Sequence, residues 1–338
     1  MVIKFYKFML NLKYLNPYLY TSMIYMSLVR YLIRRGYQSI PTFIGALLFM
    51  FILVRVLPGD PARLIAGPEA LEEDVQRIRE QLGLDKPLYA QFVDYVMTLL
   101  RGDLGTSIKF RTPVINEILH RLPYTIALAL VAEAIAVAIA LPLGIMSALR
   151  PNSKLTYVTS IISLIGASAP IFWIALMFIY VFSVSLRILP SSGADSPRHI
   201  ILPATTLSLL LMGNLTRITR SSVIEALSSN HVLTAMAKGL RDRVILIRHI
   251  LKNAMIPIVT IMGLQVGSLL GGAIITETVY AWPGIGSLLI DSIFFRDYTL
   301  IQGIILFIVL TFIVINIVID VIYALIDPRI RDVLWRVS

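Results

Sequence analysis

Long apolar runs, each near the length needed to cross a bilayer, dominate the chain. The hydrocarbon core of a bilayer requires about 20 mostly apolar residues in one helix. Six stretches meet this requirement, near residues 39–57, 123–149, 155–186, 201–224, 255–275 and 301–326. The third is too long for one straight span, and Pro170 within it predicts a kink or a break. The pattern therefore predicts an all-α integral membrane protein with six core transmembrane helices.

Residues 1–37 are also apolar and aromatic, but polar residues and a proline interrupt them. The interruptions are Asn11, Lys13, Asn16 and Pro17. This pattern favours an amphipathic segment at the cytoplasmic membrane surface over a seventh span. Translation from Met26 is an alternative that the sequence leaves open.

Residues 58–122, between the first two spans, are polar and carry many of the acidic side chains. They are predicted to lie outside the membrane. Within them Pro68 and an acidic turn begin a helix, and Gly83 supplies its stop. An apolar stripe at helical spacing consists of Leu71, Val75, Ile78 and Leu82.

Composition supports the membrane assignment and removes several kinds of chemistry. Apolar residues make up 57% of the 338 residues and charged residues only 15%, against about 25% charged in an ordinary soluble domain. There is no cysteine, which excludes a disulfide scaffold, iron–sulfur clusters, thiolate zinc sites and a cysteine nucleophile. No phosphate-binding G-x-x-x-x-G-K-[ST] motif occurs, so any ATP chemistry belongs to a separate chain.

The basic excess has a topological explanation. The formal net charge is +10, and most lysines and arginines fall in the segments that are cytoplasmic if the N-terminus is inside. This distribution follows the positive-inside rule. It predicts a multi-pass protein of the cell membrane with both termini in the cytoplasm, and it requires no nucleic acid as a partner.

Short motifs follow one another in a specific order outside and between the spans. They include LPGDPA (57–62), RGDLGTSI (101–108), SAPIFW (168–173), TAMAKGL (234–240), TETVYAWPGIG (276–286), RDYTLIQG (296–303) and DVIYALIDPRIR (320–331). From about Met26 to Arg331 their order and spacing resemble the permease subunits of dipeptide/oligopeptide-type ABC importers. The resemblance implies the type I permease (MetI-like) architecture, with an extra extracytoplasmic segment after the first helix.

The same resemblance implies a function and a set of partners. The chain is expected to form half of a translocation pathway for peptides, and the importer class also carries oligosaccharides and nickel complexes. Expected partners are a homologous second permease in a heterodimer, two cytoplasmic ABC ATPases, an extracytoplasmic solute-binding protein and membrane lipid. The implied organisation is an N-terminal segment (1–37), a first transmembrane helix (38–57), an extracytoplasmic segment (58–122), a permease core (123–327) with a cytoplasmic coupling segment (228–248), and a cytoplasmic tail (328–338).

The coupling segment departs from the general pattern of its class. Aligning the pattern on Gly239 shows the general Glu, one Ala, the Ile and the Pro replaced, while the variant matches the resembling subfamily. By resemblance, a short helix here docks on an ATPase. The residues expected to make that contact are Val232, Ala235, Met236, Gly239, Leu240, Arg241 and Arg248. The alternative is an amphipathic helix lying on the inner leaflet.

Other polar and small residues inside the spans have both a functional and a structural interpretation. Gly263, Gly267 and Gly271 share one face of the fifth span, and close helix packing is favoured over a pathway surface. Glu133 and Asp320 would have to titrate in an ion-coupled secondary transporter; a structural hydrogen bond is favoured for both. A membrane anchor without a pathway is a third class. No residue indicates a catalytic, cofactor or metal site, and the substrate contacts are not readable.

Overall fold

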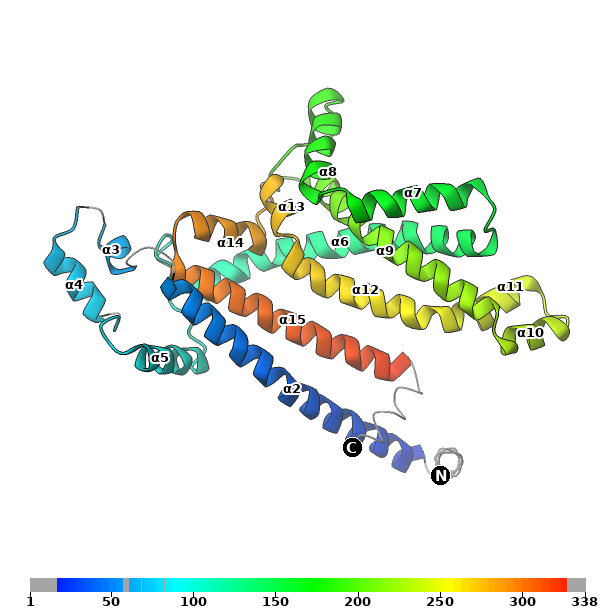
Figure 1. The fold of residues 1–338 in the computed structure, drawn as a ribbon, viewed down its shortest axis with the longest axis horizontal. Coiled ribbons are helices and arrows are strands. Elements are labelled where there is room, and N and C mark those ends of the chain that lie inside the picture. Colours follow the sequence, from blue (N-terminus) through cyan, green and yellow to red (C-terminus); the bar gives the residue numbers. More distant parts are fainter. Residues whose placement is uncertain (1–16, 57–60, 68, 82, 327–338) are drawn as a thin grey trace.

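The structure, a computed structural model, describes residues 17–56, 61–67, 69–81 and 83–326. Every regular element among them is a helix, apart from one isolated bridge between Thr106 and Pro113. In chain order these are α2 (Pro17–Val56), α3 (Pro61–Ala66), α4 (Glu72–Gln81), α5 (Leu88–Leu100), α6 (Val114–Leu149), α7 (Lys154–Ser168), α8 (Ile171–Phe178), η1 (Ile179–Ser185), η2 (Pro197–Ile200), α9 (Ile201–Leu227), α10 (Asn230–Ala237), α11 (Asp242–Val244), η3 (Ile245–Leu251), α12 (Lys252–Gly272), α13 (Ile274–Val279), α14 (Ile285–Phe294) and α15 (Tyr298–Ile326). The all-α prediction is confirmed (Figure 1).

Four helices in the described part are long and apolar enough to cross a membrane. They are Val114–Leu149, Pro197–Leu227, Asp242–Leu269 and Tyr298–Ile319. The predicted span at 155–186 is broken at Pro170, as expected: α7 ends at Ser168, and α8 begins after the proline and continues into the π-helix η1. Figure 1 shows α8 leaving the direction of α7.

Two predicted boundaries fall inside helices. α2 runs without interruption through residues 37 and 38, and the hydroxyl of Ser39 donates to the carbonyl of Arg35 within it at 2.9 Å. α6 begins at Val114, ahead of the predicted residue 123. Pro113 precedes its first turn, and the amide of Val114 donates to the carbonyl of Gly105 at 3.0 Å. The helix therefore starts within the segment that the sequence assigns outside the membrane.

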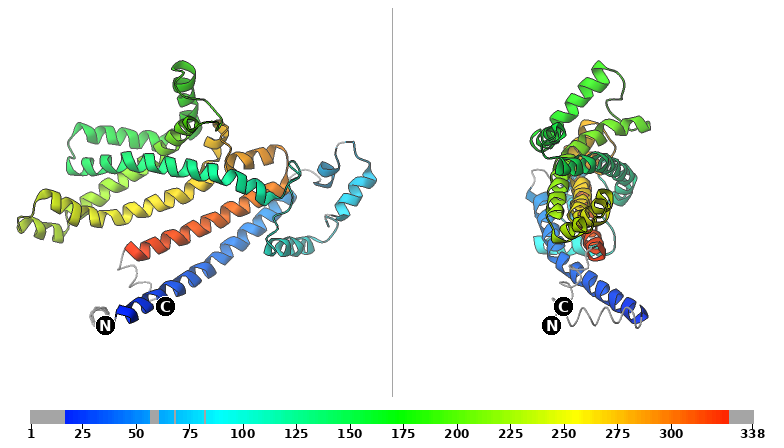
Figure 2. Two further views of the ribbon diagram at one scale, coloured as in Figure 1. Left: turned by 180° about the vertical axis from the view of Figure 1, so that it is seen from behind. Right: turned by 90° about the vertical axis from the view of Figure 1, so that its right-hand side faces the viewer.

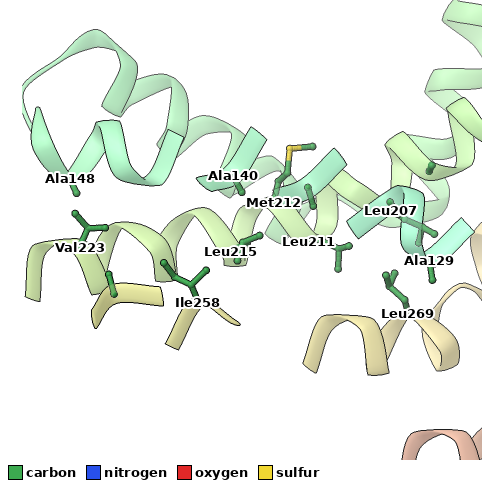
Figure 3. Close-up of a cluster of buried hydrophobic side chains, with 14 of the residues drawn as sticks. Ala129, Ala140, Ala148, Leu207, Leu211, Met212, Leu215, Val223, Ile258 and Leu269 are labelled. Carbon is green, nitrogen blue, oxygen red and sulfur yellow. The ribbon is translucent and has the colours of Figure 1, made fainter. Parts of the chain in front are cut away.

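Small residues bring the central helices together. α6, α7, α9 and α12 form one bundle, and α15 and α2 pack along it (Figures 1 and 2). α6 faces α9 and α12 with a row of buried alanines, against leucines such as Leu207 and Leu215 (Figure 3). A Cβ on Gly144 would lie 2.5 Å from the Cβ of Thr219, and one on Gly166 would lie 2.3 Å from the carbonyl oxygen of Leu209. Such close approach is typical of helix packing in membranes.

A small lobe, α3 to α5, lies beside the end of α2 (Figures 1 and 2). α4 confirms the helix that the acidic turn and apolar stripe predict: Val75 is buried, and Gly83 takes a left-handed φ of 64° after the helix ends. α5 packs on α2 through Phe92, whose ring meets that of Phe51 edge-on at 5.1 Å. α5 was not predicted from the sequence.

Candidate functional site

The predicted coupling segment folds as a short helix that ends in a tight turn. α10 stops at Ala237, and Gly239 adopts a φ of 71°. The amide of Gly239 donates to the carbonyl of Met236 at 2.9 Å, and that of Leu240 to the carbonyl of Ala235 at 3.4 Å. This pair of bonds is the Schellman helix stop, which favours glycine at the left-handed position. Gly239 therefore shapes the backbone of the segment.

The backbone conformation of Gly239, rather than a lack of space for a side chain, explains why glycine is found at this position. A Cβ at this position would meet nothing within 4 Å, so Gly239→Ala should destabilise the turn only through its left-handed backbone, by about 1 kcal/mol. Gly239→Asn should cost less, because asparagine tolerates this conformation. Hydrogen exchange of the amides of 238–241 measures the effect. Equal exchange in the alanine variant and the unaltered chain would contradict the assignment.

The structure divides the predicted coupling residues into two groups. Val232 and Ala235 are buried in the chain's own core, in the cluster that contains Ile245 and Ile250 of η3. Their predicted contact with a partner is therefore wrong as a direct contact, because neither side chain reaches the surface. They hold α10 against η3 instead.

The outward face of α10 is apolar. Leu233, Met236 and Leu240 are 55%, 48% and 40% exposed, and we call these three the α10 surface. Leu233 was not among the residues predicted from the sequence, because the face of α10 that is buried depends on η3, and the periodicity of α10 alone does not reveal it. Met236 and Leu240 remain in the predicted role.

Exposed basic residues lie close to the α10 surface in the sequence. Arg241 and Arg248, both predicted contact residues, are exposed. Three further basic side chains nearby in the chain are also exposed: Lys238, Arg243 and Lys252. Exposed apolar groups rimmed by polar ones are typical of an interaction site. The surface is suited to a partner with an apolar groove and acidic edges.

A polar cluster connects α10 to the bundle. The side-chain amide of Asn253 donates to the carbonyl of His249 at 2.9 Å and lies 2.8 Å from Nε2 of His231. His231 belongs to α10, His249 to the π-helix η3, and Asn253 to the start of α12. π-helical turns occur frequently at functional sites. A displacement of α10 would therefore be transmitted to α12 through these hydrogen bonds. It would also be transmitted to α9 through the short connection that follows Leu227.

The glycine face of the fifth span packs against α15. A Cβ on Gly263 would lie 2.9 Å from Cγ1 of Ile319, and one on Gly267 would lie 3.3 Å from Cγ2 of Ile315. The surroundings of Gly271 lie outside the described side chains. At Gly263 and Gly267 the geometry supports close packing, which the sequence analysis favoured.

Filling this contact should loosen the pair of helices. Gly263→Val is expected to destabilise the protein by about 1–3 kcal/mol, because the new methyl groups overlap Ile319. Gly45→Val is the matched control: it lies in another long helix, and a Cβ there meets nothing within 4 Å. Thermal unfolding in detergent compares the two. A larger loss for Gly45→Val would contradict the packing role.

On the far side of the bundle from α10, a buried carboxylate joins three helices. Glu277 of α13 is fully buried. Its Oε1 accepts a hydrogen bond from the hydroxyl of Thr125 in α6 at 2.8 Å. Its Oε2 accepts from the amides of Gly286 and Ser287, in the first turn of α14, at 2.7 and 3.1 Å. We call this arrangement the Glu277 brace.

Neighbouring residues complete the Glu277 brace. The hydroxyl of Thr125 also accepts from the amide of Ile285 at 2.8 Å. The indole of Trp282 donates to the carbonyl of Tyr124 at 3.0 Å. Burial raises the pKa of Glu277, while its hydrogen bonds and the charge of Arg121 oppose that rise. The TETVYAWPGIG motif is thus a structural joint, a role that the sequence analysis missed.

A second buried carboxylate begins α15. Asp297 is 1% exposed, and its Oδ1 accepts from the amide of Leu300 at 3.0 Å, as an N-terminal cap does. Its Oδ2 accepts from the hydroxyl of Ser107 at 2.6 Å and from the amide of Lys109 at 3.1 Å. The RGDLGTSI and RDYTLIQG motifs therefore meet in space, although they lie far apart in the chain.

Two other acidic residues bear on the ion-coupling alternative. Glu133 is buried in α6, and neither carboxylate oxygen has a hydrogen-bond partner among the described residues. The structural hydrogen bond predicted for Glu133 is therefore not found among the described residues of this chain. The side chain of Asp320 lies outside the described side chains. In the described part of the chain no group of three His, Asp or Glu residues is arranged to hold a metal.

Comparison with known proteins places these features in a family. Residues 140–332 match the family described as binding-protein-dependent transport system inner membrane component, and residues 28–129 match the N-terminal part of such membrane components. The chain is 45% identical over 304 residues to the glutathione transport system permease protein GsiC of Escherichia coli (strain K12), which covers 90% of this chain and 99% of that protein. The protein of the same name from Salmonella choleraesuis (strain SC-B67) is 44% identical over 304 residues, with the same coverage.

A solved structure shares the fold. The inward-facing MetNI methionine ABC transporter aligns with a TM-score of 0.53 at 19% sequence identity. The alignment covers 63% of this chain and 97% of that one. At this identity the likeness concerns the fold, and it confirms the MetI-like architecture.

Proposed function

The chain belongs to the family of binding-protein-dependent transport system inner membrane components, and from this membership we propose that it forms half of a peptide pathway through the cell membrane. It is a permease subunit of an ABC importer, and its relatives are transport permeases. In the proposal, separate subunits hydrolyse ATP and this chain provides the membrane passage that they drive.

The α10 surface supports docking of a cytoplasmic ATPase. Its three apolar side chains are exposed, and exposed basic residues follow them in the sequence. Val232 and Ala235 fix α10 to the core, and Asn253 ties it to α12. If an ATPase subunit binds this surface, closure of the ATPase dimer on ATP would thus move α9 and α12 together. This single arrangement, an exposed patch on a helix rigidly joined to two spans, carries the coupling proposal.

Peptides and peptide-like molecules such as glutathione are the proposed substrates. The support is the 45% identity with permeases whose name states glutathione transport. Oligosaccharides and nickel complexes are the competing substrates within the same importer class. A solute-binding protein outside the membrane would deliver the substrate, as the family description implies.

The proposed complex contains one further membrane subunit and a defined orientation. A homologous permease would form the other half of the pathway, and two ATPases would bind from the cytoplasm. Both termini and α10 would be cytoplasmic, as the distribution of lysine and arginine favours. The brace at Glu277 and the cap at Asp297 would then stand at the opposite face, where the binding protein docks.

Uptake by the purified importer tests this function. The chain is purified from native membranes with its bound subunits, reconstituted in liposomes, and supplied with its binding protein and ATP. Four radiolabelled substrates are compared: glutathione, an ordinary tripeptide, an oligosaccharide and a nickel complex. We expect ATP-dependent uptake of the first two. Uptake of the oligosaccharide or nickel complex alone would overturn the substrate proposal, and gradient-driven uptake by this chain alone would overturn the importer proposal.

A further inference from the structure

α5 exposes an apolar stripe along its whole length. Tyr89, Val93, Met97 and Leu100 recur at spacings of four, four and three residues, which places them on one helical face. They are 75%, 53%, 54% and 78% exposed. A stripe of this size on the surface requires an apolar neighbour.

The opposite face of α5 packs on the preceding loop and on α2. These contacts determine the direction in which the apolar stripe points. The side-chain amide of Gln91, which is buried, donates to the carbonyls of Leu84 and Lys86 at 3.1 and 2.8 Å. The rings of Phe92 and Tyr95 pack on Phe51 of α2, with centroids 5.1 and 6.1 Å away. The stripe therefore points away from α2.

The contacts of α5 show where it lies along the length of the long helices. Phe51 lies five residues before the end of α2 at Val56, which is about 8 Å along the helix axis. The adjacent Met50 packs in one cluster with Tyr298 and Ile301, from the first turn of α15. α5 thus lies beside the end of α2 and the start of α15 (Figures 1 and 2), the level at which two long helices would leave the membrane.

The stripe continues an apolar face of α2. Ile44 and Leu48 lie seven and three residues before Phe51, on the same helical face, and are 51% and 45% exposed. In a permease, such a face on a peripheral span contacts lipid. Because α5 packs on Phe51 at the end of this face, lipid that covered α2 there would also reach α5.

Polar groups beside the stripe match the boundary between lipid and water. Asp94 forms an ion pair with Lys86 at 2.7 Å, and Thr98 is exposed on the same side of the helix. Arg101 follows the helix and is exposed, within reach of a lipid phosphate. A helix with an apolar face, a polar face and a terminal arginine is typical of an interfacial anchor.

We propose that α5 is an interfacial helix whose stripe of Tyr89, Val93, Met97 and Leu100 lies against phospholipid at the end of α2. The anchor holds the α3–α5 lobe at the membrane surface. The inference does not depend on which side of the membrane the lobe occupies, or on the substrate.

Spin labels on single cysteines test the proposal, because the chain contains no cysteine. Met97→Cys and the matched control Thr98→Cys are labelled in the complete importer, held in nanodiscs of phosphatidylethanolamine and phosphatidylglycerol. Collisions with oxygen, which concentrates in lipid, and with a water-soluble nickel chelate are measured. We expect the label at 97 to meet oxygen more often and the chelate several-fold less often than the label at 98. Leu100→Cys should repeat the result at 97.

Two outcomes would overturn the proposal. Equal access of the chelate to 97 and 98 would mean that the stripe faces water. Protection of 97 from both reagents would mean that a protein covers it, either the binding protein or the second permease. Because neither outcome involves ATP or uptake, failure here is distinguishable from failure of the proposed function.

Discussion

Replacing Met236 by aspartate is expected to abolish ATP-driven uptake while the subunit remains folded in the membrane. The side chain is about half exposed on the α10 surface, at 48%, so a carboxylate can stay hydrated in the isolated subunit. Docking on an apolar groove would bury that charge without a partner. Loss of a central interface residue costs about 2 kcal/mol or more, which is roughly 30-fold in affinity. The measurement is the binding of the ATPase to the purified permease.

Two controls distinguish the effect of the position of Met236 from the effect of adding a negative charge. Met236→Leu keeps the apolar contact and should bind as the unaltered chain does. Asn152→Asp places the same charge in the exposed connection between α6 and α7, outside the three residues of the α10 surface, and should leave uptake near normal. Full uptake by Met236→Asp would show that α10 is not the docking site, and the coupling proposal would fail.

Glu277→Ala is expected to prevent accumulation of folded permease. The substitution removes the acceptor for the Thr125 hydroxyl and for the amides of Gly286 and Ser287, all in a buried joint. A buried donor left without a partner costs about 1–3 kcal/mol, so the combined loss should reach roughly 3–5 kcal/mol. Gly284→Ala should act similarly, because its Cβ would lie 2.2 Å from the Glu277 carboxyl carbon. Size-exclusion profiles of the solubilised protein measure the folded fraction.

Glu277→Gln is the matched control for this loss. The amide keeps an oxygen that can accept from Gly286 and Ser287, and its NH2 can donate to the Thr125 hydroxyl. A clearly larger folded fraction for glutamine than for alanine is expected. If alanine were tolerated as well as glutamine, the brace would not be a structural requirement.

Hydrophobic spacing predicted most of the helices, because each span must bury or expose a nearly continuous apolar surface. α9, α12 and α15 lie close to their predicted ranges, and Pro170 marks an actual break. α5 was missed because its two apolar faces, one on α2 and one exposed, conceal the alternation that reveals a half-buried helix. The early start of α6 depends on the bond from Val114 to Gly105, which local sequence does not reveal.

The position of the proposed docking site was predictable from the sequence, but the face of α10 that is exposed there was not. The motif around Gly239 located α10, yet periodicity could not distinguish the face that packs on η3 from the face left exposed, so Val232 was chosen and Leu233 missed. The Glu277 brace was missed for a different reason. Its partners come from α6 and α14, and only the folded chain brings Thr125 and Gly286 to one carboxylate.

The central claim, that α10 contacts a separate ATPase, is tested most directly by cysteine cross-linking in native membranes. The chain has no cysteine of its own, so Met236→Cys and Leu233→Cys each introduce one exposed reactive site, and Val232→Cys places one at the adjacent buried position. With a short amine-to-thiol cross-linker, we predict that the two exposed sites capture a protein with an ATP-binding P-loop and that position 232 does not. If neither exposed site captures such a protein, or if all three positions capture it equally, the account is contradicted.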